Sequence, residues 1–363
     1  PYTLTTAQQK CLMEVDQDMQ SGDRMLRLIQ GDVGSGKTIL AFLAALNCVS
    51  CNKQASIMAP TAILATQHHQ SLAPLCRDLG IEITLLTGAD KGKIRKKKLE
   101  AISTGKAQLI IGTHALFQDK IVFDNLGFVV IDEQHRFGVH QRLALSDKGK
   151  DTDILVMTAT PIPRTLTLAA YGHMDVSRLE GKHTGRKAVD TRLISTDRMA
   201  ELVDGLKRKL AAGEQAYWVC PLVEETEKSD LAAAEERHAL LQQFFGDQCA
   251  LIHGRMKAEE KDAVMAGFSS GKTRLLVATT VIEVGVNVPN ATVIVIEHAE
   301  RFGLAQLHQL RGRVGRGDKA SSCLLLYNGK LSETAKERLQ IMRRSNDGFV
   351  IAEKDLELRG AGE

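Results

Sequence analysis

An eight-residue segment near the start of the chain has the composition and spacing of a phosphate-binding loop. Gly31-Asp32-Val33-Gly34-Ser35-Gly36-Lys37-Thr38 fits the pattern G-x-x-x-x-G-K-[ST]. It follows a short apolar run at 25–29 and opens a helical pattern at 38–47, which is the context that a P-loop requires. Its glycines let backbone N–H groups curl around phosphates, and the helix start adds a favourable dipole. We therefore predict an ATP site in which Lys37 contacts the β- and γ-phosphates and the Thr38 hydroxyl binds Mg²⁺.

Two adjacent carboxylates at the end of a later apolar run would complete this site. Asp132 and Glu133 follow the run at 128–131. Asp132 would hold Mg²⁺ through water, and Glu133 would polarise the attacking water as a general base. Such a pair could also be a surface turn, but its occurrence together with a P-loop favours the catalytic interpretation.

A glycine-rich segment late in the chain carries arginines at a spacing suited to phosphate. Gln309-Leu310-Arg311-Gly312-Arg313-Val314-Gly315-Arg316 fits Q-x-x-G-R-x-G-R. Arginine is always charged and binds phosphate through two parallel hydrogen bonds. Gln309, Arg313 and Arg316 are therefore candidate catalytic residues that would stabilise charge on the γ-phosphate held by the first half. The alternative is a basic loop that touches nucleic acid, and without the P-loop the two interpretations would weigh equally.

Two further segments place hydroxyl residues or glycine directly after predicted strands. Thr158-Ala159-Thr160-Pro161 follows an apolar run, and its short hydroxyl side chains, Thr158 and Thr160, can relay hydrogen bonds without bulk. The segment 278–289 begins Ala278-Thr279, and its Gly285 would allow close backbone approach to nucleotide or phosphate.

Three short segments directly after predicted strands are candidates for contacting nucleic acid. They are Pro60-Thr61-Ala62, Gly112-Thr113-His114 and His253-Gly254-Arg255-Met256. Ligands of open α/β sheets bind outside the carboxyl ends of the strands, where N–H and hydroxyl groups can hold phosphates without reading sequence. Each segment could also be a simple turn. The pair His68-His69 lies on a predicted helix at 66–79, where we expect a structural role.

Short, continuous apolar runs alternate with helical patterns along the whole chain, which is typical of parallel sheets wrapped by helices. We predict two α/β lobes, at 1–180 and 181–330, joined near the polar segment 181–186. A helical hairpin and the start of a loop should follow at 331–363, with helices at 332–344 and 348–358. The predicted strands lie at 25–29, 56–58, 109–111, 128–131, 154–157, 216–220, 249–253, 274–278, 293–296 and 323–327.

The composition is that of a globular protein with aliphatic cores. Hydrophobic residues make up 44% and charged residues 25%, which excludes a disordered chain, and only 4% of residues are aromatic, so base-stacking platforms should be few. The formal charge is only +3, but the run 91–98 (KGKIRKKK) could follow a phosphate backbone. A solvated helix face explains that run equally well. Cys48 and Cys51 form the one C-x-x-C, and we expect Cys48 to pack in a helix rather than bind metal.

The amino-acid sequences of the motifs resemble those of the RecG family of superfamily-two helicases. The segments 132–142 (DEQHRFGVHQR), 158–166 (TATPIPRTL), 219–225 (VCPLVEE) and 301–316 (RFGLAQLHQLRGRVGR) carry the resemblance, whereas the transcription-repair translocase Mfd differs at DEQH. The resemblance implies that Gln8 reads the adenine edge. It also implies that the segment 158–161 couples hydrolysis to movement and that the segment 278–289 links the nucleotide to nucleic acid. It also implies that the tail, ending near Arg359, belongs to a translocation motif, and that an N-terminal wedge domain lies outside this chain.

This resemblance implies that the two lobes are RecA-like P-loop NTPase lobes. It also implies an ATP- and Mg²⁺-dependent helicase that translocates on duplex DNA, migrates Holliday junctions and regresses stalled forks. We expect forked or branched DNA as the partner, bound without sequence preference, and single-stranded-DNA-binding protein as a further candidate. We also expect a cytoplasmic, nucleoid-associated monomer that binds no membrane. Two alternatives are a different motor, such as an RNA helicase or an Mfd-type translocase, and a non-catalytic binding module. The complete set of ATP-site residues argues against the second.

Overall fold

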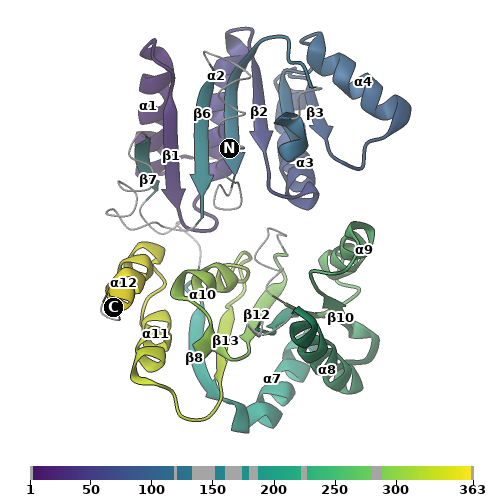
Figure 1. Ribbon diagram of the computed structural model, residues 1–363, viewed down its shortest axis with the longest axis vertical. Coiled ribbons are helices and arrows are strands. Elements are labelled where there is room, and N and C mark those ends of the chain that lie inside the picture. The colour runs from purple at the N-terminus through teal and green to yellow at the C-terminus, as the bar shows by residue number, and fades with distance from the viewer. Residues whose placement is uncertain are drawn as a thin grey trace. The chain divides into compact units, whose positions relative to one another are not determined.

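The computed structural model describes residues 3–117, 121–132, 152–159, 174–179, 187–221, 227–279 and 288–360. The chain divides into two compact units, Pro1–His183 and Thr184–Glu363, which we call the first and second lobe. Figure 1 colours the chain from purple in the first lobe to yellow at the end of the second. The predicted joint at 181–186 falls outside the described residues.

The first lobe is built on a parallel sheet of seven strands in the order β3-β4-β2-β5-β6-β1-β7. Every described strand pair is parallel. The strands are β1 (Leu26–Gly31), β2 (Gln54–Met58), β3 (Ile83–Leu86), β4 (Leu109–Gly112), β5 (Leu126–Asp132), β6 (Asp153–Thr158) and β7 (Asp175–Leu179).

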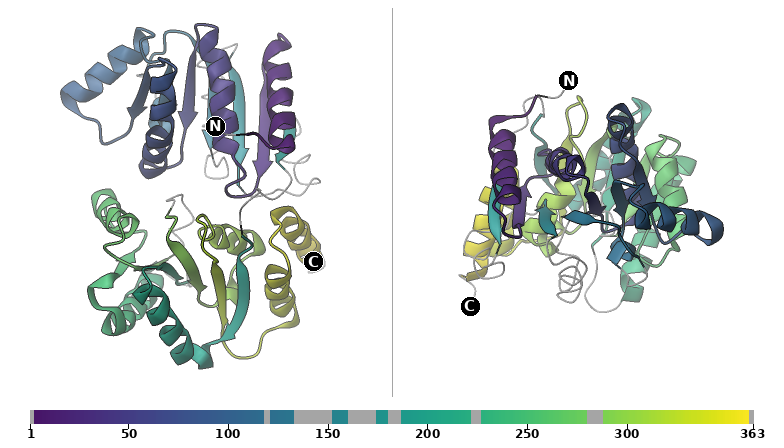
Figure 2. Two further views of the ribbon diagram at one scale, coloured as in Figure 1. Left: turned by 180° about the vertical axis from the view of Figure 1, so that it is seen from behind. Right: turned by 90° about the horizontal axis from the view of Figure 1, so that it is seen from above.

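Alternate side chains of the central strands enter two separate cores. Leu28 and Val129 lie in one buried cluster, whereas their chain neighbours Ile29 and Val130 lie in another. The second cluster includes side chains of three helices, which lie in front of the strands in the rear view of Figure 2. These helices are α1 (Thr6–Gln20), α2 (Lys37–Ser50) and α3 (Ala62–Asp78), while α4 (Gly92–Ser103) packs beside β3.

The second lobe repeats this plan with a parallel sheet of six strands in the order β10-β11-β9-β12-β13-β8. Its helices α7 (Met199–Ala211) and α8 (Glu227–Phe245) share a core with the central strands. The tail helices α11 (Glu333–Arg344) and α12 (Gly348–Gly360) belong to this lobe and pack against α10 (Leu304–Arg311). The remaining elements are β8 (Asp190–Ser195), β9 (Gln215–Val219), β10 (Cys249–Ile252), β11 (Leu275–Ala278), β12 (Ala291–Ile296), β13 (Ser322–Tyr327) and α9 (Ala258–Ser269).

The predicted fold class is confirmed, and each of the ten predicted strands is present. The sequence did not predict β3, β7 and β8. All three are edge strands, and only one or two of the residues in each are buried. An edge strand needs no continuous apolar run, which is the signal that identified the other strands.

Six of the seven cysteines are buried, whereas Cys51 is exposed. Cys48 is buried, its Sγ lies 3.4 Å from the Gln54 carbonyl, and burial raises the pKa of its thiol to about 12. Among the described residues, no group of three His, Cys, Asp or Glu side chains could hold a metal ion. The burial of Cys48 confirms its expected packing role. No helix in the described ranges is long and apolar enough to cross a membrane.

Candidate nucleotide site and nucleic-acid surface

The predicted P-loop connects the end of β1 to the start of α2. Gly34 and Gly36 adopt positive φ angles of 79° and 87°, which residues with a side chain rarely adopt, so glycine is required at both turns. A Cβ atom on Gly31 would lie 2.6 Å from Ser35 Oγ and 2.9 Å from Leu179 Cβ, so this position has no room for a side chain. The loop therefore closes tightly in front of the helix.

Lys37 lies inside the loop that it follows. Its Nζ atom donates to the carbonyls of Gly31 at 2.6 Å and Asp32 at 2.9 Å, and the residue is only 8% exposed. Thr38 is the next residue, in the first turn of α2. The ammonium group and the start of the helix thus place positive charge at one point, as binding of phosphates requires.

The Ser35 side chain supports the same interpretation. Its Oγ atom is shielded from solvent and has no hydrogen-bond partner among the described residues. Buried polar groups are normally paired. An unpaired hydroxyl inside a glycine-lined loop fits a site whose partner is a phosphate oxygen.

Gln8 ties α1 to the P-loop. Its Oε1 atom accepts from the Thr5 backbone N–H at 2.9 Å, and its Nε2 atom donates to the Ser35 carbonyl at 2.9 Å. The first bond belongs to a capping box with Thr5 that starts the helix. The structure therefore places Gln8 at the loop, while its expected contact with adenine stays a prediction.

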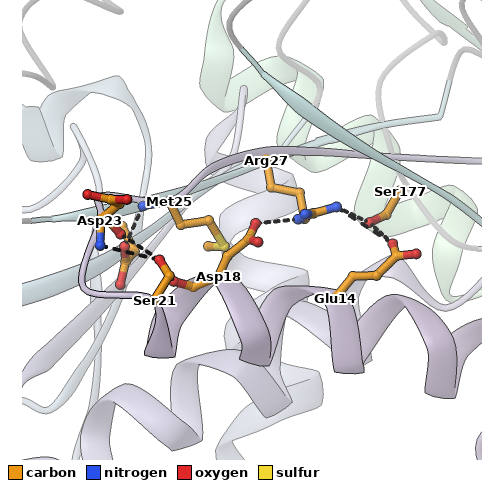
Figure 3. A network of polar contacts seen from close by, with 8 residues as sticks. Glu14, Asp18, Ser21, Asp23, Met25, Arg27 and Ser177 are labelled. Carbon is orange, nitrogen blue, oxygen red and sulfur yellow. Dashed lines mark hydrogen bonds and ion pairs between the residues drawn. The ribbon is translucent and has the colours of Figure 1, made fainter.

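A network of charged and polar side chains fixes α1 to the sheet (Figure 3). The Arg27 Nε of β1 lies 2.6 Å from Asp18 Oδ2, and its Nη1 donates to Ser177 Oγ of β7 at 2.9 Å. Ser177 Oγ in turn donates to Glu14 Oε2 at 2.5 Å. Burial opposes the charge on Arg27, but the hydrogen bond and charge of Asp18 outweigh it and raise the pKa of the guanidinium. The helix that carries Gln8 is thus held against β1, the strand that leads into the P-loop.

Asp132, the predicted metal ligand, is the last residue of β5 and is 8% exposed. Its Oδ2 atom lies 2.9 Å from Nε2 of His68, which is also 8% exposed and belongs to α3. The sequence pattern predicted a structural role for His68 and did not connect it with Asp132. With the Thr38 hydroxyl as a direct ligand, Asp132 would hold Mg²⁺ through water beside the nucleotide phosphates. His68 would then orient the metal-binding carboxylate.

The segments predicted to touch nucleic acid in the first lobe lie at the carboxyl ends of two neighbouring strands. Pro60 and Thr61 follow β2, Thr113 follows Gly112 at the end of β4, and β2 and β4 are adjacent parallel strands. Thr61 also caps α3 by accepting from Leu64 N at 3.3 Å. A Cβ atom on Gly112 would meet the β3 backbone, at 2.3 Å from the nearest carbonyl oxygen. The structure therefore brings these residues together as the parallel sheet predicts.

The corresponding residues of the second lobe also lie together. His253, Gly254 and Arg255 follow β10, and Thr279 follows the neighbouring strand β11. The Thr279 backbone N–H donates to the Ile252 carbonyl at 3.4 Å, which joins the two strand ends. The His253 Nδ1 atom is buried and has no partner within the ranges that the structure describes.

The arginine-rich motif lies at the end of α10 and in the following turn. Arg313 is buried, and Arg316 Nε donates to the Gly312 carbonyl at 3.2 Å. Burial raises the pKa of the Tyr217 phenol to about 12, although the positive charges of Arg316 and Arg313 oppose this shift. Gln309 lies on α10 itself.

Arg311 has a different role, which the sequence did not reveal. Its Nη1 donates to the carbonyls of Met342 at 2.8 Å and Ser345 at 2.7 Å, at the carboxyl end of α11. Its Nη2 lies 3.0 Å from His308 Nδ1. Arg311 therefore connects the arginine-rich motif to the tail helices and has a structural role there.

Thr158 ends β6 and pairs in register with Gln30 of β1, beside the start of the P-loop. Three of the remaining predicted site residues, Glu133, Thr160 and Gly285, lie outside the described residues. For the other two, His114 and Arg359, the structure describes the backbone and not the side chain. Their roles stay predictions.

Comparison with known proteins identifies the family. The family model for the DEAD/DEAH box helicase matches residues 5–169, and that for the helicase conserved C-terminal domain matches residues 197–318. The ATP-dependent DNA helicase RecG of Escherichia coli (strain K12) is 52% identical over 369 residues, and RecG of Bacillus subtilis (strain 168) is 49% identical over 365 residues. The chain belongs to the RecG helicase family. Each alignment covers 100% of the chain and 53% of the relative, so the chain spans about half the length of these RecG proteins.

Solved structures agree with this assignment. A structure of RecG bound to a three-way DNA junction has a TM-score of 0.87 and 45% sequence identity, and the match covers 100% of this chain and 48% of that chain. Dbp5 of S. cerevisiae bound to RNA and ADP BeF3 has a TM-score of 0.70 at 18% identity, with 99% of this chain and 94% of that chain covered, which shows the fold alone. The resemblance to RecG predicted from the motifs is therefore confirmed.

Proposed function

We propose that this chain is the ATP-driven motor of a RecG-type DNA helicase, which couples ATP hydrolysis to translocation on duplex DNA. The observation that carries the proposal is the closed P-loop with Lys37 inside it, in the same lobe as the buried pair His68–Asp132. The high identity to RecG supports DNA, rather than RNA, as the substrate.

Each part of the nucleotide site has a proposed task. Lys37 binds the β- and γ-phosphates, and Asp132 with the Thr38 hydroxyl holds Mg²⁺, which neutralises charge on the phosphates. Glu133 accepts a proton from the attacking water. Arg313 and Arg316 stabilise the charge that develops on the transferred phosphate, with Gln309 beside them. Gln8 contacts the adenine edge, and Gly285 allows the backbone to approach the nucleotide.

The strand-end residues of both lobes are proposed to hold the DNA backbone without reading sequence. Thr61, Thr113 and Thr279 offer hydroxyl groups where ligands of open α/β sheets bind. Thr158 and Thr160 relay the state of the nucleotide to this surface. We further propose branch migration of Holliday junctions and regression of stalled forks as the reactions served, in recombination and repair. The protein would act as a monomer at the nucleoid, with single-stranded-DNA-binding protein as a partner.

The substrate is tested by the rate of ATP hydrolysis with no nucleic acid, linear duplex, forked DNA or structured RNA, with Lys37→Ala as the blank. We expect stimulation by both DNA forms and the greatest rate with forks. Stimulation by RNA alone would replace the proposal with an RNA helicase. Absence of turnover under every condition would indicate a non-catalytic binding module.

A further inference from the structure

A strongly basic segment follows β3, an edge strand of the first lobe. Residues 87–100 contain six cations and two carboxylates, a formal charge of +4, whereas the whole chain has a formal charge of +3. Most of the segment forms α4, which Figure 1 shows at the margin of the lobe beside β3. The excess positive charge of the chain is therefore concentrated here.

The cations of this segment point to two faces of the helix. Lys98 Nζ lies 2.6 Å from Asp90 Oδ1, and Arg95 Nη1 donates to the Thr87 carbonyl at 3.5 Å. These two cations share the inward face with Ile102, which is fully buried in the core beside β3 and β4. They attach the helix to the lobe.

The other four cations of the segment are exposed. Lys93, Lys96 and Lys97 are exposed and lie at i, i+3 and i+4, which places them on one face of the helix, and the exposed Lys91 directly precedes α4. No ion pair joins these four ammonium groups to a carboxylate of the residues that the structure describes. We call these four lysines the basic face.

The basic face works against the stability of its own helix. The amino-terminal end of a helix carries partial positive charge and favours acidic residues, but the first turn of α4 has no acidic residue and no side-chain cap. Like charges at i and i+4 repel each other as well. Clustered lysines that oppose both effects, with no partner among the described residues of the lobe, indicate a binding function rather than a structural one.

We propose that the basic face binds the phosphate backbone of duplex DNA. The proposal rests on DNA being the substrate of the motor. The place in the fold supports it, because the segment begins directly after β3, whose neighbour β4 leads to Gly112 and Thr113. The charge of the four lysines is complementary to a polyanion, and each can neutralise one phosphate.

The chemistry of the basic face matches phosphates and not bases. Residues 87–104 contain no aromatic side chain on which an unpaired base could stack. Lysine presents a point charge on a flexible stem, without the planar fork by which arginine grips phosphate in fixed geometry. DNA binding at this face should therefore be independent of sequence and sensitive to salt.

The test compares the chain with the triple variant Lys93→Gln/Lys96→Gln/Lys97→Gln, which keeps good helix formers and removes three charges. A matched control, Lys207→Gln/Arg208→Gln/Lys209→Gln, removes three exposed charges from α7 near the amino end of β9, away from the carboxyl ends of the strands. A second control, Lys93→Arg/Lys96→Arg/Lys97→Arg, keeps the charges. Binding of a fluorescent linear duplex is measured by anisotropy from low to moderate salt, and thermal unfolding is measured in parallel.

The expected result is weaker DNA binding by the glutamine variant of α4, by roughly tenfold or more at low salt. The plot of log K against log salt should be shallower by about 0.9 for each phosphate that is no longer neutralised, about 2 to 3 in total. The unfolding temperature should not fall, and both control variants should bind as the original chain does. If the glutamine variant of α4 binds DNA with unchanged affinity and unchanged salt dependence, while duplex DNA still stimulates hydrolysis by the original chain, the proposed role of the basic face is wrong and the proposed function stands. Absence of any duplex binding or stimulation in the original chain would overturn the proposed function itself.

Discussion

The hydrogen bond between His68 and Asp132 gives the sharpest test of the nucleotide site. In the variant His68→Ala, the carboxylate of Asp132, a residue that is 8% exposed, loses a hydrogen bond of 2.9 Å. An unsatisfied buried group costs about 1–3 kcal/mol, and removing a partner that orients a metal ligand commonly weakens metal binding about 10- to 100-fold. We therefore expect a higher Mg²⁺ concentration for half-maximal ATP hydrolysis and weaker calorimetric binding of Mg²⁺ with a non-hydrolysable ATP analogue.

The neighbouring residue provides the control. His69 lies on the same helix and is partly exposed, and burial, with a smaller effect of Lys98, lowers its pKa. His69→Ala should leave the Mg²⁺ requirement unchanged, and His68→Gln, which keeps a donor, should recover part of the Mg²⁺ affinity. Equal Mg²⁺ requirements in His68→Ala and the original chain, with both folded, would refute the orienting role.

Three further changes probe separate parts of the molecule. Lys37→Ala should abolish hydrolysis, whereas Glu133→Gln should keep ATP binding; equal loss of nucleotide binding in both would contradict the assigned roles. Gly31→Ala should weaken nucleotide binding at least tenfold in calorimetry, because its Cβ would lie 2.6 Å from Ser35 Oγ, and normal affinity would show that the loop can widen. Arg311→Ala removes charged donors from two carbonyls at the end of α11 and should lower the free energy of unfolding of the second lobe by about 2 kcal/mol or more, as measured by denaturant titration. If the free energy of unfolding falls by less than about 0.5 kcal/mol, water satisfies the two carbonyls in place of the guanidinium.

The fold was predictable wherever burial on both faces leaves a continuous apolar run in the sequence. The strand β5 (Leu126–Asp132) is buried from its second residue onward and was found for that reason. The strand β7 (Asp175–Leu179) was missed because it lies at an edge, where Ser177 and Arg178 occupy positions that a central strand would give to apolar residues. Edge position depends on the order of strands in the sheet, which the sequence pattern does not state.

The P-loop was predictable because its chemistry depends on consecutive residues, whereas contacts between distant elements were not. His68 lies 64 positions from Asp132. One signal could have found it: Ala65, His68 and Leu72 are spaced to share the inward face of α3, and all three are buried. A histidine on such a face needs a polar partner. The partner's identity required the sheet order that brings α3 to the end of β5.

The most direct test of a DNA-driven motor is the rate of ATP hydrolysis by the chain with and without duplex DNA, beside Lys37→Ala. We predict Mg²⁺-dependent turnover that duplex DNA stimulates and that the variant lacks. A rate of ATP hydrolysis that is the same with and without DNA, or that Lys37→Ala retains, would contradict the proposed function.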